Sequence, residues 1–198
     1  MSALILASAS AVRARLLREA GVPFAVCPAG IDEEEIKASL LEGKLGADAI
    51  ADALAERKAI QASAAHPEAL VLGCDQILAF AGRLIGKAAD LTKARVLLRE
   101  LRGKEHSLLT ACVLAKGGVP VWRWLERCRL WMRPFSDTFL DEYLQIEGDK
   151  LLGSVGCYHL EGRGIQLFER VEGDYFSVLG LPLLPLLAAL REQGIVER

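Results

Sequence analysis

The chain of 198 residues lacks the signatures of several protein classes. Its five cysteines are scattered, and none has the CxxC or metal-ligand spacing typical of zinc or redox sites. The three histidines show no catalytic or metal spacing either. The N-terminus lacks the basic region and long apolar stretch of a secretory signal, and no window approaches a membrane-spanning apolar run. We therefore expect reduced thiols in a cytoplasmic protein without membrane contact.

The chain also lacks a large excess of charge of either sign, since its formal net charge is −2. This balance excludes a global electrostatic attraction to nucleic acid, and no nucleic-acid partner is expected. Hydrophobic residues make up 52% of the chain, which allows a sizeable core and excludes a disordered composition. Internal repeats and low-complexity linkers are absent, so we predict one domain, or one two-lobed unit, over residues 1–198.

Helical and strand patterns alternate along the chain. Strands are expected at 3–7, 22–28, 69–80 and 165–171, with a hairpin over 106–133 that turns at Gly117-Gly118. Helices are expected at 11–20, 47–64 and 92–101, after Ser136, and from Pro182 onward. Because hairpins accompany the alternation, a mixed α/β fold with helices packed on a mixed sheet is favoured over a strictly parallel sheet.

The first strand-to-helix junction, LILASASAVRARLL, combines two hydroxyls with an arginine. Ser10 is a good N-cap, and the first N–H groups of a helix attract anions. Helical side chains lean toward the N-terminus, so Arg13 can reach the same place as Ser8 and Ser10 and bind a phosphate. The alternative is an ordinary serine cap beside a solvated arginine.

Two charged residues interrupt apolar patterns. Ile50, Leu54 and Lys58 are four residues apart and share a helix face, so Lys58 either extends to solvent or meets an anion in a cleft. Asp75 interrupts the apolar run LVLGCDQILAF. A buried carboxylate needs a partner, so Asp75 is a candidate for metal ligation or base chemistry, with a structural salt bridge as the alternative.

Three further charged residues are weaker candidates by themselves. Lys87 follows a short strand expected to pair with the one that carries Asp75, but a lone lysine there is more often on the surface. Glu33 belongs to an acidic run, which is usually a solvated face. Glu161 lies in a loop bracketed by glycines, where the backbone can approach a ligand or simply turn tightly.

The segment from Trp122 to Arg133 combines aromatic and basic residues, a pattern that can indicate nucleic-acid binding. The two kinds of residue alternate, however. One face carries Trp122, Trp124, Cys128, Leu130 and Met132, and the other carries Arg123, Arg127, Arg129 and Arg133. An amphipathic strand with a solvated basic face is the favoured interpretation.

Taken together, the motifs resemble the Maf family of nucleoside triphosphate pyrophosphatases, also described as septum-formation inhibitors. They are, in order, LILASAS-x-x-R-x-x-LL, DE, A-x-x-KA, GCDQ, GK, L-x-GK-x-H-x-x-x-T, G-x-Y-x-x-E-G-x-G and GD-x-x-x-V-x-GLPL. The resemblance spans nearly the whole chain. It implies an elongated mixed sheet with flanking helices as in inosine triphosphatases, two lobes around a cleft, and a homodimer.

The same resemblance implies a hydrolase that converts a nucleoside triphosphate to the monophosphate and pyrophosphate with a divalent cation such as Mg, Mn or Co. The residues that would hold phosphates are Ser8, Ser10, Arg13, Lys58 and Lys87. Glu33 and Asp75 would lie near the metal and the water, with Asp75 as the proton acceptor. The alternative is a nucleotide-binding regulator of cell division that acts through protein contacts, for which the basic strand face is a candidate surface.

Three positions that separate branches of the family are Val12, Gln76 and Glu161. The DQ and EG-x-G motifs resemble the branch that acts on 7-methyl-GTP, where a carboxylate such as Glu161 can accept hydrogen bonds from guanine N1–H and N2–H2. Val12 departs from this branch, which favours a large aromatic residue there, and Ala88 replaces the usual proline after GK.

Overall fold

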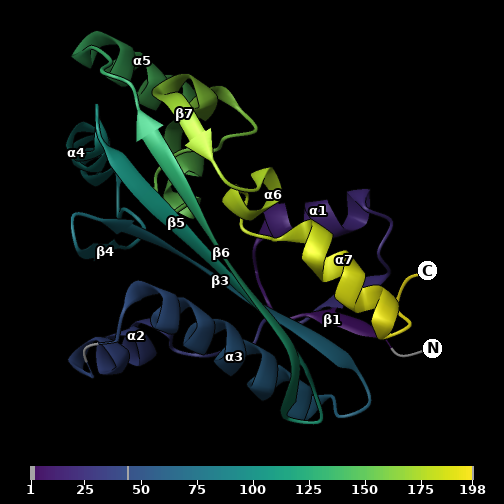
Figure 1. The fold of residues 1–198 in the computed structure, drawn as a ribbon. Helices are drawn as coiled ribbons and strands as arrows, with labels where there is room; N and C mark the ends of the chain where they lie inside the picture. Colours follow the sequence, from purple (N-terminus) through teal and green to yellow (C-terminus); the bar gives the residue numbers. More distant parts are fainter. Residues whose placement is uncertain (1–2, 44, 198) are drawn as a thin grey trace. The chain divides into compact units, whose positions relative to one another are not determined.

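The computed structural model describes residues 3–43 and 45–197 and has a mixed α/β architecture (Figure 1). The strands are β1 (Leu4–Leu6), β2 (Phe24–Val26), β3 (Leu70–Phe80), β4 (Arg83–Ile85), β5 (Glu105–Lys116), β6 (Val119–Met132) and β7 (Phe168–Glu172). The α-helices are α1 (Ala11–Glu19), α2 (Glu33–Glu42), α3 (Ala47–Ala65), α4 (Leu91–Leu101), α5 (Asp137–Glu147), α6 (Tyr175–Val178) and α7 (Leu183–Glu192). Two 3₁₀ helices are η1 (Gly148–Gly153) and η2 (Arg163–Leu167). The predicted mixed α/β class is confirmed.

One seven-stranded sheet has the order β2-β1-β3-β5-β6-β7, and β4 pairs with β3. β1 lies parallel to both β2 and β3, whereas β4 and β7 are antiparallel to their partners. The β5–β6 connection is the predicted two-glycine turn: Gly117 and Gly118 both have positive φ, as a type I′ hairpin turn requires. Among the described residues, no helix combines the length and hydrophobicity needed to span a membrane.

The contacts divide the chain into two compact units. The first comprises Met1–Gln76, Thr110–Glu126 and Tyr175–Arg198, and the second comprises Ile77–Leu109 and Arg127–Asp174. β3, β5 and β6 contribute residues to both units.

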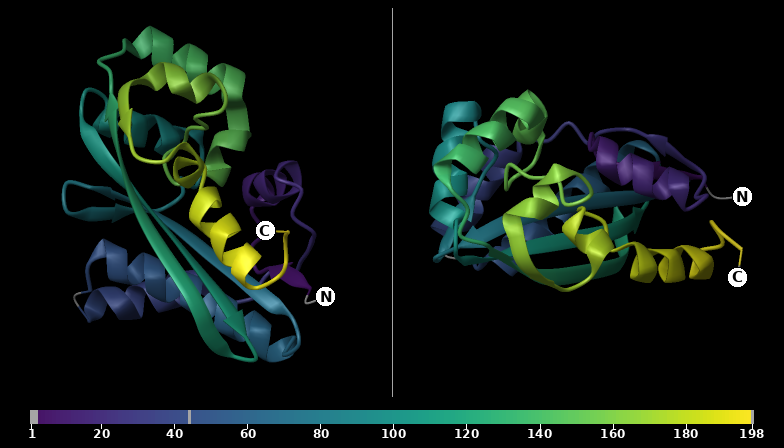
Figure 2. Two further views of the ribbon diagram at one scale, coloured as in Figure 1. Left: turned by 45° about the vertical axis from the view of Figure 1, so that its right-hand side comes forward. Right: turned by 90° about the horizontal axis from the view of Figure 1, so that it is seen from above.

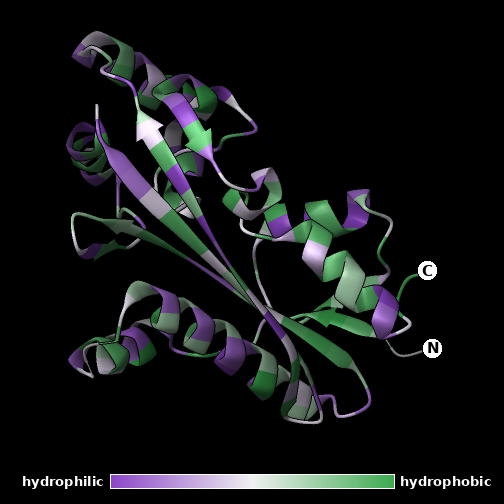
Figure 3. Ribbon diagram, in the orientation of Figure 1, coloured by the Kyte–Doolittle hydropathy of each residue, from purple (hydrophilic) through white to green (hydrophobic). Residues whose placement is uncertain are grey.

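In the first unit, alternate residues of β3 face different helices. Leu70, Leu72 and Cys74 join a core with β1, α1 and α7. Val71 packs with Ala62 of α3 instead. Figures 1 and 2 show α3 on one side of these strands, with α1 and α7 on the other. β1 and the adjoining part of β3 are hydrophobic throughout, because both of their faces are covered (Figure 3).

In the second unit, α4 buries the predicted apolar face Ala94, Leu97, Leu98 and Leu101. Arg95 of α4 forms a bidentate ion pair with Asp141 of α5. The strand predicted at 165–171 is wrong in its first part, because residues 163–167 form η2 and the strand starts at Phe168. The 3₁₀ turn is closed by a hydrogen bond from the Ile165 N–H to the Gly162 carbonyl.

Candidate active site

The N-terminus of α1 is built as the sequence predicts. The Ser10 hydroxyl caps the helix by accepting a hydrogen bond from the Arg13 N–H at 3.3 Å, and the Ser8 hydroxyl accepts one from the Ser10 N–H at 3.3 Å. These bonds place both hydroxyls at the positive end of the helix dipole.

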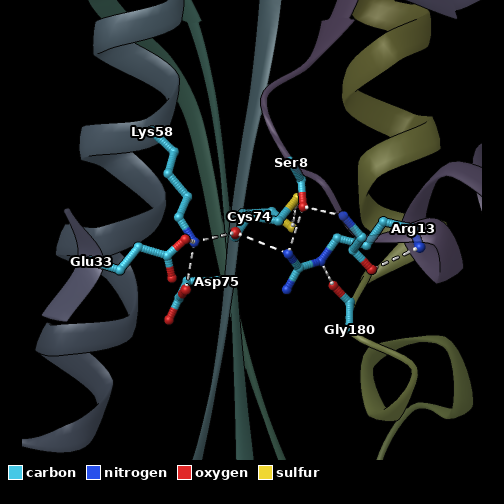
Figure 4. Close-up of polar contacts among 9 residues, drawn as sticks. Ser8, Arg13, Glu33, Lys58, Cys74, Asp75 and Gly180 are labelled. Atoms are coloured by element: carbon cyan, nitrogen blue, oxygen red, sulfur yellow. Dashed lines mark hydrogen bonds and ion pairs between the residues drawn. The ribbon is translucent and has the colours of Figure 1, made fainter. Parts of the chain in front are cut away.

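Arg13 is not a solvated side chain, because only 9% of its surface is exposed. Its Nε donates to the Gly180 carbonyl at 2.8 Å, and its Nη1 donates to Ser8 Oγ at 3.0 Å and to the Cys74 carbonyl at 3.2 Å (Figure 4). No acceptor for Nη2 is found in residues 3–43 and 45–197. Anchoring Nε and Nη1 of a planar guanidinium also sets the direction of Nη2, which keeps two N–H groups for an anion.

Lys58 and Asp75 meet in the interior of the first unit. β3 alternates, so Asp75 follows Val71 and Gly73 toward α3, where Lys58 continues the buried stripe of Ile50 and Leu54. Lys58 Nζ lies 2.8 Å from Asp75 Oδ1, and the two side chains are 8% and 9% exposed. Lys58 thus meets an anion and does not extend to solvent.

Glu33 joins this pair from the start of α2. Its Oε1 lies 2.9 Å from Lys58 Nζ, although the Glu33 side chain remains 49% exposed. The lysine therefore bridges a buried and a half-exposed carboxylate. The acidic run that sequence reasoning treated as a solvated face supplies one side chain to an interior cation.

The Cys74 carbonyl connects the two cationic centres. It accepts hydrogen bonds from Arg13 Nη1 at 3.2 Å and from Lys58 Nζ at 3.4 Å. Figure 4 shows Lys58, Asp75 and Glu33 on one side of β3 and Arg13 on the other. Two positive charges, a helix N-terminus and two carboxylates therefore gather around one peptide group, an arrangement suited to a polyphosphate and a proton acceptor.

Two buried thiols, Cys74 and Cys112, lie beside this peptide group. Their sulfur atoms are 3.1 Å apart, and both thiols are free. Burial raises the pKa of the Cys112 thiol. Burial also acts to raise the pKa of Cys74, but the hydrogen bond from Cys112 and the charges of Arg13 and Lys58 outweigh it, so this pKa is lowered. Arg13 and Lys58 thus both act electrostatically on Cys74, and Asp75 opposes them.

Gln76 and Val12, two of the predicted specificity residues, also belong to the first unit. Gln76 Nε2 donates to Thr110 Oγ1 at 2.9 Å and to the carbonyls of Ser177 and Val178 at 3.0 and 3.1 Å. Val12 is half-buried against the core beneath α1. Thr110 is the last residue of the motif L-x-GK-x-H-x-x-x-T, but sequence reasoning gave it no role, although a hydroxyl inside the apolar run LLTACVL was a signal for one.

Lys87 and Glu161 lie in the second unit. Lys87 is exposed in the segment after β4, and Glu161 is exposed in the turn between η1 and η2. Their phosphate-binding and base-recognition roles stay predictions. The same holds for metal binding by Glu33 and Asp75, since the described residues contain no cluster of three or more His, Cys, Asp or Glu side chains suited to a metal.

The arginines of β6 are exposed, as the amphipathic pattern predicts, and two of them form surface ion pairs. Arg123 pairs with Asp52 at 2.7 Å, and Arg129 pairs with Glu172 at 2.6 Å. Trp124 lies on the apolar face of the predicted amphipathic strand, yet its side chain is exposed and its Nε1 donates to Glu126. An amphipathic indole tolerates such a position when its N–H has a partner.

Comparison with known proteins assigns this chain to a family. The model for Maf-like proteins matches residues 3–193. A nucleoside triphosphate pyrophosphatase of Caulobacter vibrioides is 51% identical over 189 residues, which cover 96% of this chain and 94% of the relative. A nucleoside triphosphate pyrophosphatase of Maricaulis maris is 46% identical over the full length of both chains. A 7-methyl-GTP pyrophosphatase of Brucella abortus is 43% identical over 98% of each chain. This chain therefore belongs to the Maf-like protein family.

Proposed function

We propose that this chain hydrolyses a nucleoside triphosphate to the nucleoside monophosphate and pyrophosphate. The observation that carries the proposal is the convergence of Arg13 and Lys58 on the Cys74 carbonyl, directly beside the buried Asp75. The relatives named nucleoside triphosphate pyrophosphatase support the same reaction.

Phosphate binding is assigned to the α1 N-terminus and its neighbours. The Arg13 Nη2 group donates to phosphate oxygens, while Ser8 and Ser10 add hydroxyls at the positive end of the helix. Lys58 supplies a second positive charge from α3. Lys87 of the second unit is proposed to hold a further phosphate, on the strength of the family motif alone.

In the chemical step, a water oxygen forms a bond to the α-phosphorus, and the bond from that phosphorus to the oxygen bridging to the β-phosphorus breaks. Asp75 takes the proton of the attacking water, and pyrophosphate leaves with the bridging oxygen. Arg13 and Lys58 offset the negative charge that grows on the transferred and leaving phosphates. The contact between Lys58 and Asp75 Oδ1 also orients the carboxylate.

A divalent cation fits this donor set. Glu33 and Asp75 each place one oxygen within 2.9 Å of Lys58 Nζ, so the two carboxylates converge, and each has a second oxygen that can ligate an ion. Mg²⁺ is commonly held by one or two carboxylates together with substrate phosphates, which matches two acidic side chains. We propose that Glu33 and Asp75 hold Mg, Mn or Co. When bound, such an ion supplies further neutralisation of phosphate charge.

Within this reaction class, we propose 7-methyl-GTP as the substrate. The relatives named 7-methyl-GTP pyrophosphatase are 43–46% identical to this chain. Glu161 is proposed to read the guanine edge, and Val12 and Gln76 to contribute to base choice. The family resemblance also supports a cytoplasmic homodimer. Light scattering measures the mass of the particle in solution and tests the dimer directly.

The test is pyrophosphate release from 7-methyl-GTP, GTP, UTP and dTTP with Mg, Mn or Co. D75N is expected to lower kcat by a factor of about 10² to 10⁴. The matched control is D149N, which changes an exposed aspartate of η1. Absence of turnover with every triphosphate, or full activity of D75N, would refute the proposal. Nucleotide binding without turnover would favour the regulator.

A further inference from the structure

The orientation of Arg13 depends on a short turn between α6 and α7. Gly180 supplies the carbonyl that accepts from Arg13 Nε at 2.8 Å. Gly180 has a φ of +97°, a conformation that suits glycine. Its N–H donates to the Ser177 carbonyl at 3.0 Å, and the Leu181 N–H donates to the Phe176 carbonyl at 3.1 Å. The position of the Gly180 carbonyl is therefore set by a hydrogen-bonded turn that begins at Ser177.

Thr110 of β5 holds the start of this turn. Its hydroxyl donates to the Ser177 carbonyl at 2.8 Å and accepts from Gln76 Nε2 at 2.9 Å. Gln76 Nε2 also reaches the Ser177 and Val178 carbonyls. Thr110 and Ser177 are only 1% and 0% exposed. A buried hydroxyl in an apolar strand is costly unless it is hydrogen-bonded, and here it is used both as donor and as acceptor.

We infer that Thr110 is a positioning residue for Arg13. Its hydroxyl fixes the Ser177 carbonyl, the turn from Ser177 to Gly180 transmits that position, and the Gly180 carbonyl sets the guanidinium plane so that Nη2 faces the phosphate. Thr110 thereby acts on the reaction without touching substrate. The inference rests on the proposed function, because it takes Arg13 as a phosphate ligand.

Two substitutions separate the hydroxyl from the bulk of the side chain. T110V keeps the shape but loses both hydrogen bonds, so the turn loosens and kcat/KM is expected to fall by between about tenfold and about a hundredfold. T110S keeps the hydroxyl and is expected to stay within about twofold of the wild type. T92V removes a hydroxyl from the exposed Thr92 of α4 and serves as the matched control.

A double-mutant cycle shows whether Thr110 works through Arg13. R13K retains the charge but has no Nε–H for the Gly180 carbonyl, so adding T110V to R13K is expected to change kcat/KM by less than about twofold. Where turnover is too slow to measure, the dissociation constant of pyrophosphate gives the same comparison. Calorimetry measures it for the wild type, T110V, R13K and the double variant. T110A replaces T110V if the valine variant does not fold.

The possible outcomes distinguish failure of the positioning role of Thr110 from failure of the proposed phosphate-binding function. A folded T110V with wild-type kcat/KM, a T110S as impaired as T110V, or an equal effect of T110V in the R13K background overturns the positioning role. If R13K itself leaves kcat/KM and pyrophosphate affinity unchanged, the phosphate-binding role of Arg13 fails, and the inference fails with it. Three results together support both the phosphate-binding role of Arg13 and the positioning role of Thr110. R13K loses activity, T110V has little further effect in the R13K background, and T110S retains the activity that T110V loses.

Discussion

Replacing Lys58 by methionine tests the electrostatics of the site most directly. Methionine retains an apolar stem of similar length but removes the ammonium group that lies 2.8 Å from Asp75 and 2.9 Å from Glu33. The Asp75 side chain is 9% exposed, so water cannot replace the lost partner fully. Glu33 is 49% exposed and is readily hydrated. The cost of K58M should therefore come mainly from Asp75.

Removing one partner of a buried ion pair costs about 3–5 kcal/mol, whereas a partly exposed pair contributes about 0–1 kcal/mol. Since Asp75 retains slight exposure, we expect K58M to lower the free energy of unfolding by about 3 kcal/mol. For a chain of this size, that corresponds to a fall in Tm of about 6–12 °C. Adding D75N removes the uncompensated charge, so the double variant K58M/D75N is expected to recover about 2 kcal/mol.

The assay is urea unfolding at pH 7 followed by far-ultraviolet circular dichroism, with thermal melts in parallel. K93M, which changes an exposed lysine of α4, is the matched control and is expected to stay within about 0.5 kcal/mol of the wild type. A loss below about 1 kcal/mol in K58M, or a double variant no more stable than K58M, would refute this account of a charge pair held out of water.

Three further predictions concern packing, capping and pH. A Cβ on Gly73 would lie 2.2 Å from a backbone oxygen of α3, so G73A should cost about 3 kcal/mol, whereas G86A, with no atom within 4 Å, should leave Tm unchanged. S10A and S136A each remove a helix N-cap and should each cost about 1 kcal/mol in urea unfolding, but only S10A should raise KM. Burial lowers the pKa of His106 to about 4, so the unfolded chain binds more protons than the folded one between that pH and 6.5. Stability should then fall by up to about 3 kcal/mol as the pH drops through this interval, and H106Q should flatten the slope; an unchanged slope in H106Q would contradict this assignment.

Local patterns predicted several structural features of the candidate site. The Ser10 cap, the buried stripe that ends in Lys58 and the interrupted apolar run at Asp75 all follow from periodicities within one element, and the structure confirms each of them. The second half of the hairpin was less well predicted. Trp124 alternates as a buried residue should, yet alternation alone does not say whether another element covers that face.

The sequence alone predicts most of the helices and strands, the buried faces of α3 and α4 and the family to which the chain belongs, because caps, periods and motifs are local properties of the chain. Which charges meet is a property of the tertiary fold. Lys58 reaches both Asp75 and Glu33, and the Cys74 carbonyl is shared with Arg13 from the opposite side of β3. The link from Thr110 to the turn that holds Arg13 is likewise tertiary. Such partnerships depend on strand register and on how helices pack against the sheet, and no pattern within one segment encodes them.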